Sequence, residues 1–107
     1  MAQSEVIKIL KQYCLLLIAS GIKVDKAYLY GSYLHGDATP DSDIDVMIVS
    51  SLFDKENIEM KSKAWRLTEK ISFKIEPYIV GTEKFLHDDV SPLLQIVKKE
   101  GFEIKFV

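Results

Sequence analysis

The sequence is poor in cysteine, proline and glycine: it has one, three and five of them among its 107 residues. A single cysteine excludes an intramolecular disulfide, and because Cys14 lies among leucines at helical spacing we expect it to be a buried thiol. No cluster of Cys and His residues suits zinc. The longest apolar run, Tyr13 to Ala19, is far shorter than the roughly 20 residues of a membrane-spanning helix. We therefore expect a cytoplasmic protein that does not associate with membranes.

The sequence also lacks an excess of positive charge. It has 14 Lys and Arg against 16 Asp and Glu, which gives a net charge of -2. Proteins that grip a nucleic-acid backbone usually have a basic excess, so a long nucleic acid is not the expected partner. Hydrophobic residues make up 48% of the chain, as in ordinary globular proteins. We expect one domain over residues 1–107, with no room for a second, substrate-binding domain.

Apolar periodicity predicts helices that alternate with strands. A helix is expected over residues 4–20, with Ser4 as its N-cap and a left-handed Gly21 at its end. A second helix is expected from Asp54, as its cap, to Ile71, and a third from Ser91-Pro92 to Gly101. Strands are expected over residues 26–30, 44–49, 73–80 and 102–107, and residues 81–89 suit either a short helix or a loop. This order predicts an α/β (α+β) domain with one small mixed β-sheet flanked by helices.

The loop after the first expected strand begins with Gly31 and Ser32. A glycine lets a phosphate approach the backbone closely, and the serine hydroxyl and a following helical turn would offer hydrogen-bond donors at the same place. Most Gly-Ser pairs after a strand are simple turns, so this pair alone does not establish a phosphate site.

Asp43 and Asp45 give a stronger signal. They lie two residues apart at the head of an apolar strand, so both side chains point to one face. Neighbouring carboxylates repel each other, and ligation by oxygen alone suits Mg²⁺. A solvated acidic turn is the alternative. An EF-hand is excluded because Val46 and Leu52 stand where its loop needs glycine and glutamate.

Gly31-Ser32, ten intervening residues and then Asp43-Ile44-Asp45 resemble the signature of the polymerase-beta-like nucleotidyltransferase superfamily. The short chain is similar to the minimal branch of that superfamily, in which the catalytic domain stands alone. The resemblance implies a nucleotidyltransferase fold, ATP as donor, and triphosphate binding by Gly31 and Ser32. It also implies two Mg²⁺ ions, or Mn²⁺, held by Asp43, Asp45 and a third carboxylate. One departure is His35, where many members have arginine.

Glu76 is the candidate for the third catalytic and metal-binding carboxylate. It lies inside an otherwise apolar expected strand, where a charged residue requires a partner such as a metal ion. Pro77 conflicts with a central position of this strand, because proline cannot donate to a sheet ladder. A solvent-facing glutamate on an edge strand is the alternative.

The resemblance implies transfer of a nucleoside monophosphate, with AMP from ATP as the expected case, to a hydroxyl acceptor. Minimal nucleotidyltransferases are commonly encoded beside a helical HEPN-domain protein, so the expected acceptor is a tyrosine hydroxyl of such a toxin, with this chain as its antitoxin. One alternative is a non-catalytic antitoxin that masks its partner. Another is an aminoglycoside-type transferase, whose acceptor pocket would have to come from oligomerisation.

Overall fold

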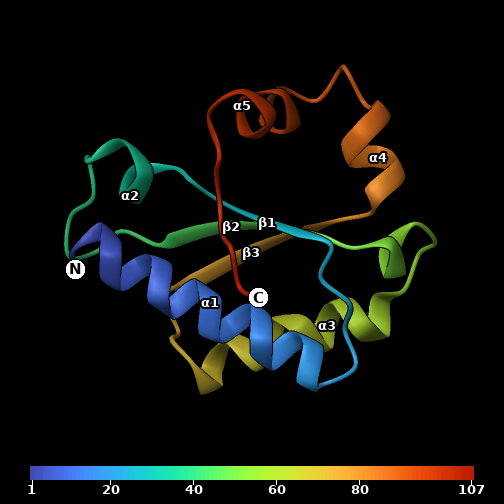
Figure 1. The fold of residues 1–107 in the computed structure, drawn as a ribbon, viewed down its shortest axis with the longest axis horizontal. Coiled ribbons are helices and arrows are strands. Elements are labelled where there is room, and N and C mark those ends of the chain that lie inside the picture. Colours follow the sequence, from blue (N-terminus) through green and yellow to red (C-terminus); the bar gives the residue numbers. More distant parts are fainter.

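A four-stranded mixed sheet forms the centre of the protein (Figure 1), as the computed structural model of residues 1–107 shows. The strands are β1 (Lys26–Tyr30), β2 (Ile44–Val49), β3 (Ile75–Val80) and β4 (Phe102–Glu103), and their spatial order is β3-β2-β1-β4. Strand β2 pairs antiparallel with β1 and parallel with β3. The parallel pair needs a crossover connection, which helix α3 provides. The expected mixed sheet flanked by helices is confirmed.

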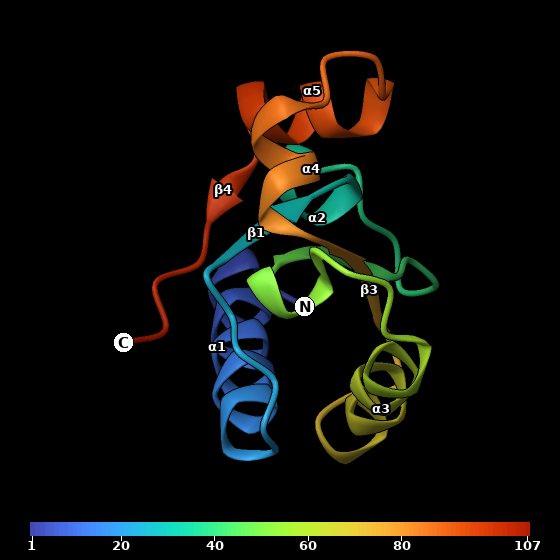
Figure 2. The ribbon, with the colours of Figure 1, turned by 90° about the vertical axis from the view of Figure 1, so that its right-hand side faces the viewer.

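Helices cover both faces of this sheet (Figure 2). They are α1 (Gln3–Ala19), α2 (Ser32–His35), α3 (Ile58–Leu67), α4 (Thr82–His87) and α5 (Pro92–Glu100). Because side chains alternate along a strand, β2 sends Val46 into the larger core with α1 and α3, and Met47 into a smaller core with α4 and α5. The Tyr13 hydroxyl donates to the Ala64 carbonyl at 2.7 Å and so joins α1 to α3. Cys14 is buried as expected, and burial raises the pKa of its thiol to about 12.

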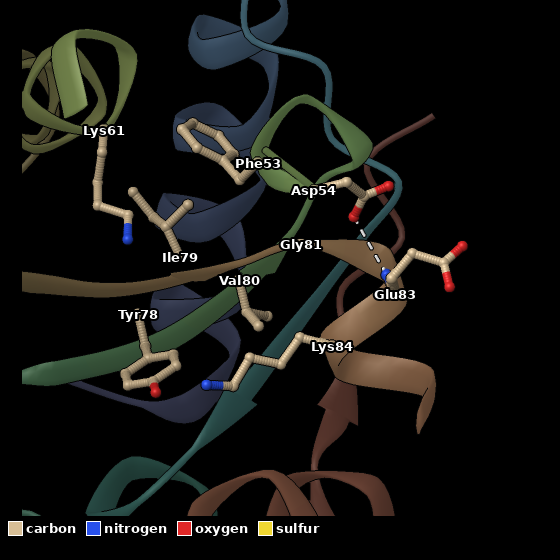
Figure 3. A pocket seen from close by; sticks show the side chains of 9 residues that line it. All are labelled: Phe53, Asp54, Lys61, Tyr78, Ile79, Val80, Gly81, Glu83 and Lys84. Carbon is tan, nitrogen blue, oxygen red and sulfur yellow. Dashed lines mark hydrogen bonds between the residues drawn. The ribbon is translucent and has the colours of Figure 1, made fainter. Parts of the chain in front are cut away.

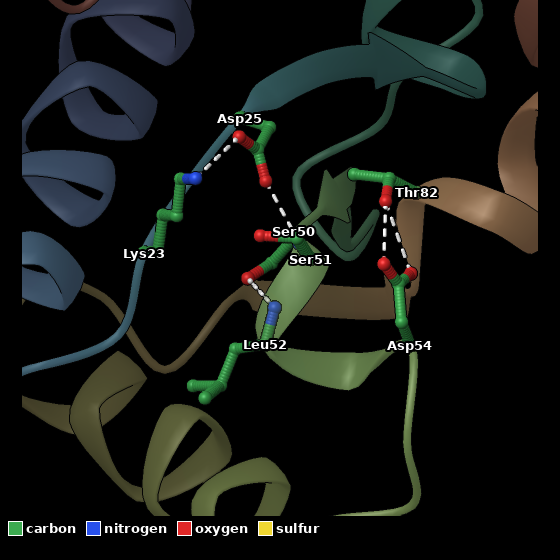
Figure 4. Close-up of polar contacts among 7 residues, drawn as sticks. All are labelled: Lys23, Asp25, Ser50, Ser51, Leu52, Asp54 and Thr82. Carbon is green, nitrogen blue, oxygen red and sulfur yellow. Dashed lines mark hydrogen bonds and ion pairs between the residues drawn. The ribbon is translucent and has the colours of Figure 1, made fainter.

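The segment after β2 differs from the sequence prediction (Figure 4). Helix α3 begins at Ile58, where the Asn57 side chain accepts from the Met60 N–H, so the predicted cap at Asp54 is wrong. Asp54 instead follows a short 3₁₀ turn and accepts hydrogen bonds from the Thr82 hydroxyl and the Glu83 N–H. It thus stabilises the first turn of α4, a helix that sequence reasoning left undecided.

Other helix and strand ends differ by a few residues. Helix α1 begins at Gln3 with Ala2 as its N-cap, so the prediction of Ser4 as the cap is wrong. Gly21 has a φ of 91° and follows α1 in the left-handed conformation, as expected. The expected strands 73–80 and 102–107 shorten to Ile75–Val80 and Phe102–Glu103. None of the helices combines the length and the apolar character that a bilayer crossing requires.

The edge position of β3 removes the difficulty with Pro77. Ile44 N–H donates to the Lys74 carbonyl and Ser50 N–H to the Val80 carbonyl. In a parallel ladder, the N–H and carbonyl groups of alternate residues point toward the same neighbouring strand. The even-numbered residues of β3 therefore direct these groups toward β2, whereas Pro77 and Ile79 direct theirs away from the sheet, toward its open edge. The missing N–H of Pro77 costs no hydrogen bond within the sheet, which is why the strand accepts a proline.

Candidate functional site

A row of polar side chains crosses three neighbouring strands of the sheet. Asp45 of β2 is paired in register with Tyr30 of β1 on one side and with Glu76 of β3 on the other. Residues paired in register point to the same face, and Asp43 lies two positions before Asp45, so it points to that face as well. The structure therefore brings the three sequence-predicted carboxylates together, on the face that α4 and α5 cover in part.

The three carboxylates interact electrostatically. Hydrogen bonding with Asp43, followed by partial burial and the charges of Asp43 and Asp45, raises the pKa of Glu76. Partial burial and then the charge of Asp43 raise the pKa of Asp45. None of the three forms an ion pair with a lysine, arginine or histidine. The row thus carries uncompensated negative charge, which favours a cation.

The donor set of this row fits a hard divalent cation. It consists of carboxylate oxygens alone, which are the ligands that Mg²⁺ and Mn²⁺ take in proteins. No group of three or more His, Cys, Asp or Glu side chains is already gathered as a complete ligand set.

Gly31 lies directly against Asp45. Its φ of 81° is one that residues with a side chain rarely adopt, and a Cβ on Gly31 would stand only 2.3 Å from Asp45 Oδ2. The Asp45 carboxylate by itself requires a glycine at position 31, in addition to the approaching phosphate that the sequence suggests. Ser32, half-buried, opens α2 immediately afterwards. Both residues therefore adjoin the carboxylate row on its β1 side.

His35 lies outside this row. Its Nε2 is 3.6 Å from Glu100 Oε2, so it joins α2 to the last turn of α5. Both side chains are about half exposed. The sequence could not predict this contact, since the partner comes from the far end of the chain.

Two tyrosines near the carboxylates were not among the predicted site residues. Burial, followed by the charges of Asp45, Glu76 and Tyr78, raises the pKa of Tyr30 to about 12. Tyr78 follows Glu76 by two residues on the edge strand, so it lies on the same face and remains partly exposed. The two-residue spacing of Glu76 and Tyr78 is the sequence signal that could have identified Tyr78, whereas Tyr30 joins the row through its register with Asp45, which the sequence does not show.

Known proteins share this arrangement of elements. Residues 4–106 match the family model described as nucleotidyltransferase domain. The fold is similar to that of a candidate nucleotidyltransferase from Sulfolobus solfataricus, known from a crystal structure, with a TM-score of 0.61 and 19% sequence identity. That likeness covers 78% of this chain and 73% of the other, and at this identity it concerns the fold alone. None of the curated proteins matches the chain significantly.

Proposed function

The chain belongs to the nucleotidyltransferase domain family, and from this premise we propose that it transfers AMP from ATP to a hydroxyl group of a partner protein. Members of the family generally depend on a nucleoside triphosphate and a divalent metal ion. The observation that carries the proposal is the row of Asp43, Asp45 and Glu76 on one face, with Gly31 against Asp45.

The carboxylates hold the metal in this proposal. Asp43, Asp45 and Glu76 are the residues that would bind two Mg²⁺ ions, and Mn²⁺ has the same ligand preference. When bound, these ions supply Lewis-acid stabilisation of the charge that develops on the phosphate oxygens. Gly31 and Ser32 bind the triphosphate beside the Asp45 carboxylate, which lies directly against Gly31.

The reaction is a displacement at the α-phosphorus. The acceptor oxygen forms a bond to this phosphorus while the bond to the bridging oxygen breaks, and pyrophosphate leaves with the electron pair. Glu76 accepts the proton of the acceptor hydroxyl.

The acceptor in this proposal is a tyrosine hydroxyl of a HEPN-domain toxin, which the modification silences. The resemblance to the minimal branch supports a protein acceptor, and so does the net charge of -2, which does not suit a long nucleic acid. A tyrosine hydroxyl is a nucleophile of high pKa, and it needs in-line positioning and activation of the kind that a metal-bound carboxylate site offers.

The test is co-expression with a HEPN-domain protein encoded beside this chain, followed by intact mass spectrometry of that partner protein. We expect AMP-sized additions with the natural chain and none with Asp43→Asn. A parallel incubation with ATP labelled at the α-phosphate identifies the donor. A tight complex whose partner carries no added mass, and which still protects when Asp43 and Asp45 are both replaced, would favour masking instead.

A further inference from the structure

The two ends of the carboxylate row lie over different parts of the sheet. Gly31 and Ser32 adjoin it at the end of β1, whereas Glu76 belongs to β3, the edge strand on the opposite side of β2. In an in-line displacement, the attacking and leaving oxygens lie on opposite sides of the phosphorus. If pyrophosphate leaves over Gly31 and Ser32, the acceptor must arrive across β3. This step rests on the proposed function.

A cavity of about 280 Å³ lies along this edge, over the C-terminal half of β3 (Figure 3). Its lining includes Asp54, Lys61, Tyr78, Ile79, Glu83 and Lys84. Tyr78 forms the wall nearest to Glu76, which precedes it by two residues on the same strand. The cavity therefore lies at the edge of the sheet: Tyr78 borders it on the face that carries the carboxylates, and Ile79 and Lys61 border it on the opposite face.

The end of the cavity that Tyr78 lines is positively charged. Lys61 comes from α3 and Lys84 from α4, on either side of β3, and neither forms an ion pair within the chain. Figure 3 shows both ammonium groups at the same end of the cavity as Tyr78, with Lys84 beside Tyr78 and Lys61 across β3 beside Ile79, and it shows the carboxylates of Asp54 and Glu83 at the other end.

The two carboxylates of the cavity are already engaged. Asp54 accepts hydrogen bonds from Thr82 and from the Glu83 N–H, and the Glu83 carboxylate lies 3.5 Å from His87 Nε2. Neither carboxylate lies within ion-pair distance of Lys61 or Lys84, so an anionic ligand at the Tyr78 end would meet two ammonium groups that have no carboxylate partner.

We propose that an acidic segment of the acceptor protein docks along the free edge of β3, between Lys61 and Lys84, and brings its hydroxyl past Tyr78 to Glu76. Charge complementarity selects an acidic segment, because both unpaired groups are cations. The edge itself offers the outward-facing N–H and carbonyl of Ile79 to an extended chain. The donor triphosphate is placed at the other end of the row, so these lysines remain for the acceptor.

The test uses a fluorescent random copolymer of glutamate and tyrosine as the probe, with a lysine–tyrosine copolymer for comparison. The variant is the double substitution Lys61→Glu/Lys84→Glu. Its matched control is Arg66→Glu/Lys99→Glu, which changes the net charge equally at exposed positions of α3 and α5. We expect the dissociation constant of the acidic copolymer to rise by at least about tenfold in the variant and by less than about twofold in the control. The natural chain should bind the basic copolymer more weakly than the acidic one.

Three results would overturn the proposal. The first is equal weakening in the variant and in the control. The second is a loss of ATP affinity in the variant that matches its loss of copolymer affinity, which would assign the lysines to the donor. The third is tighter binding of a single-stranded oligonucleotide through the same lysines. Because copolymer binding requires no transfer, this assay decides on the docking surface even if the chain labels no acceptor and the proposed function fails.

Discussion

Asp45 and Glu76 are direct neighbours in register on two parallel strands, and no cationic side chain is paired with either of them. Their pairing brings together two parts of the chain that the whole of α3 separates in sequence. Folding thus places like charges side by side, at a cost that the rest of the sheet offsets.

Asp43→Asn and Asp45→Asn should each abolish transfer without unfolding the protein. Removing one negative charge relieves repulsion in the row, so the melting temperature without metal should stay the same or rise. Loss of a metal-binding carboxylate should lower turnover by about 10²-fold or more. Thermal melts with and without Mg²⁺, together with transfer assays, measure both effects. Full activity in either variant would contradict the assignment.

Glu76→Gln should reduce turnover more than ATP affinity. The amide keeps the shape of the side chain but can neither accept the acceptor proton nor supply an anionic ligand. Single-turnover rates and calorimetric ATP binding separate the two effects. Glu69→Gln is the control, because Glu69 is exposed on the 3₁₀ turn that follows α3. A parallel loss of affinity and rate in Glu76→Gln would place Glu76 in the donor site instead.

Gly31→Ala should destabilise the protein more than Gly36→Ala. Both glycines have positive φ, but a Cβ on Gly36 meets no atom within 4 Å, whereas one on Gly31 collides with Asp45. We expect a cost of about 1–2 kcal/mol for Gly36→Ala from the left-handed backbone alone, and a larger one for Gly31→Ala. Urea denaturation measures both. Gly31→Ala should also weaken ATP binding, since it displaces the Asp45 carboxylate.

Asp54→Ala should lower the free energy of unfolding and should make it vary less with pH in the acid range. Hydrogen bonds from the Glu83 N–H and the Thr82 hydroxyl hold the pKa of Asp54 below its usual value. The stabilisation that the ionised Asp54 carboxylate provides is therefore fully present above the unfolded-state pKa of about 3.9. It is lost as the pH falls through the lower folded-state pKa. Melts over this acid range, compared with Asp89→Ala at an exposed site, measure the difference. Equal profiles would contradict the helix-capping role.

Tyr13→Phe should destabilise the packing of α1 on α3. The buried hydroxyl donates to the Ala64 carbonyl, and its removal leaves that carbonyl without this partner, at a cost of about 1–2 kcal/mol. Tyr33→Phe is the matched control, because Tyr33 is also largely buried but its hydroxyl forms no hydrogen bond within the protein. Denaturant midpoints compare the two variants.

Local pattern was enough to predict most of the sheet and the face on which the carboxylates lie. Strands 26–30 and 44–49 have strong apolar character, and the two-residue spacing of Asp43 and Asp45 determines a common face whatever the partner strand. The family resemblance, not the spacing, identified Glu76, and the site roles of these residues stay predictions. What the structure adds is the register that brings Glu76 beside Asp45.

Sequence reasoning failed where a side chain bonds to a distant segment. Asp54 is a good helix cap by residue type, and the helix expected after it is close at hand, yet the side chain caps α4 instead. Asn57, three residues later, caps α3. Which of two good caps serves which helix depends on the tertiary path of the chain, and single-sequence patterns do not contain it.

The proline in β3 has a consequence for the behaviour of the chain in concentrated solution. An exposed edge strand is a template on which copies of the same chain can add strand to strand and aggregate. Pro77 removes one donor from the middle of this edge, so a second copy of β3 cannot form a complete ladder against it. Pro77 thus opposes growth into a continuous intermolecular sheet, while the edge stays open to a single incoming segment. Replacing Pro77 should make the protein more prone to aggregation.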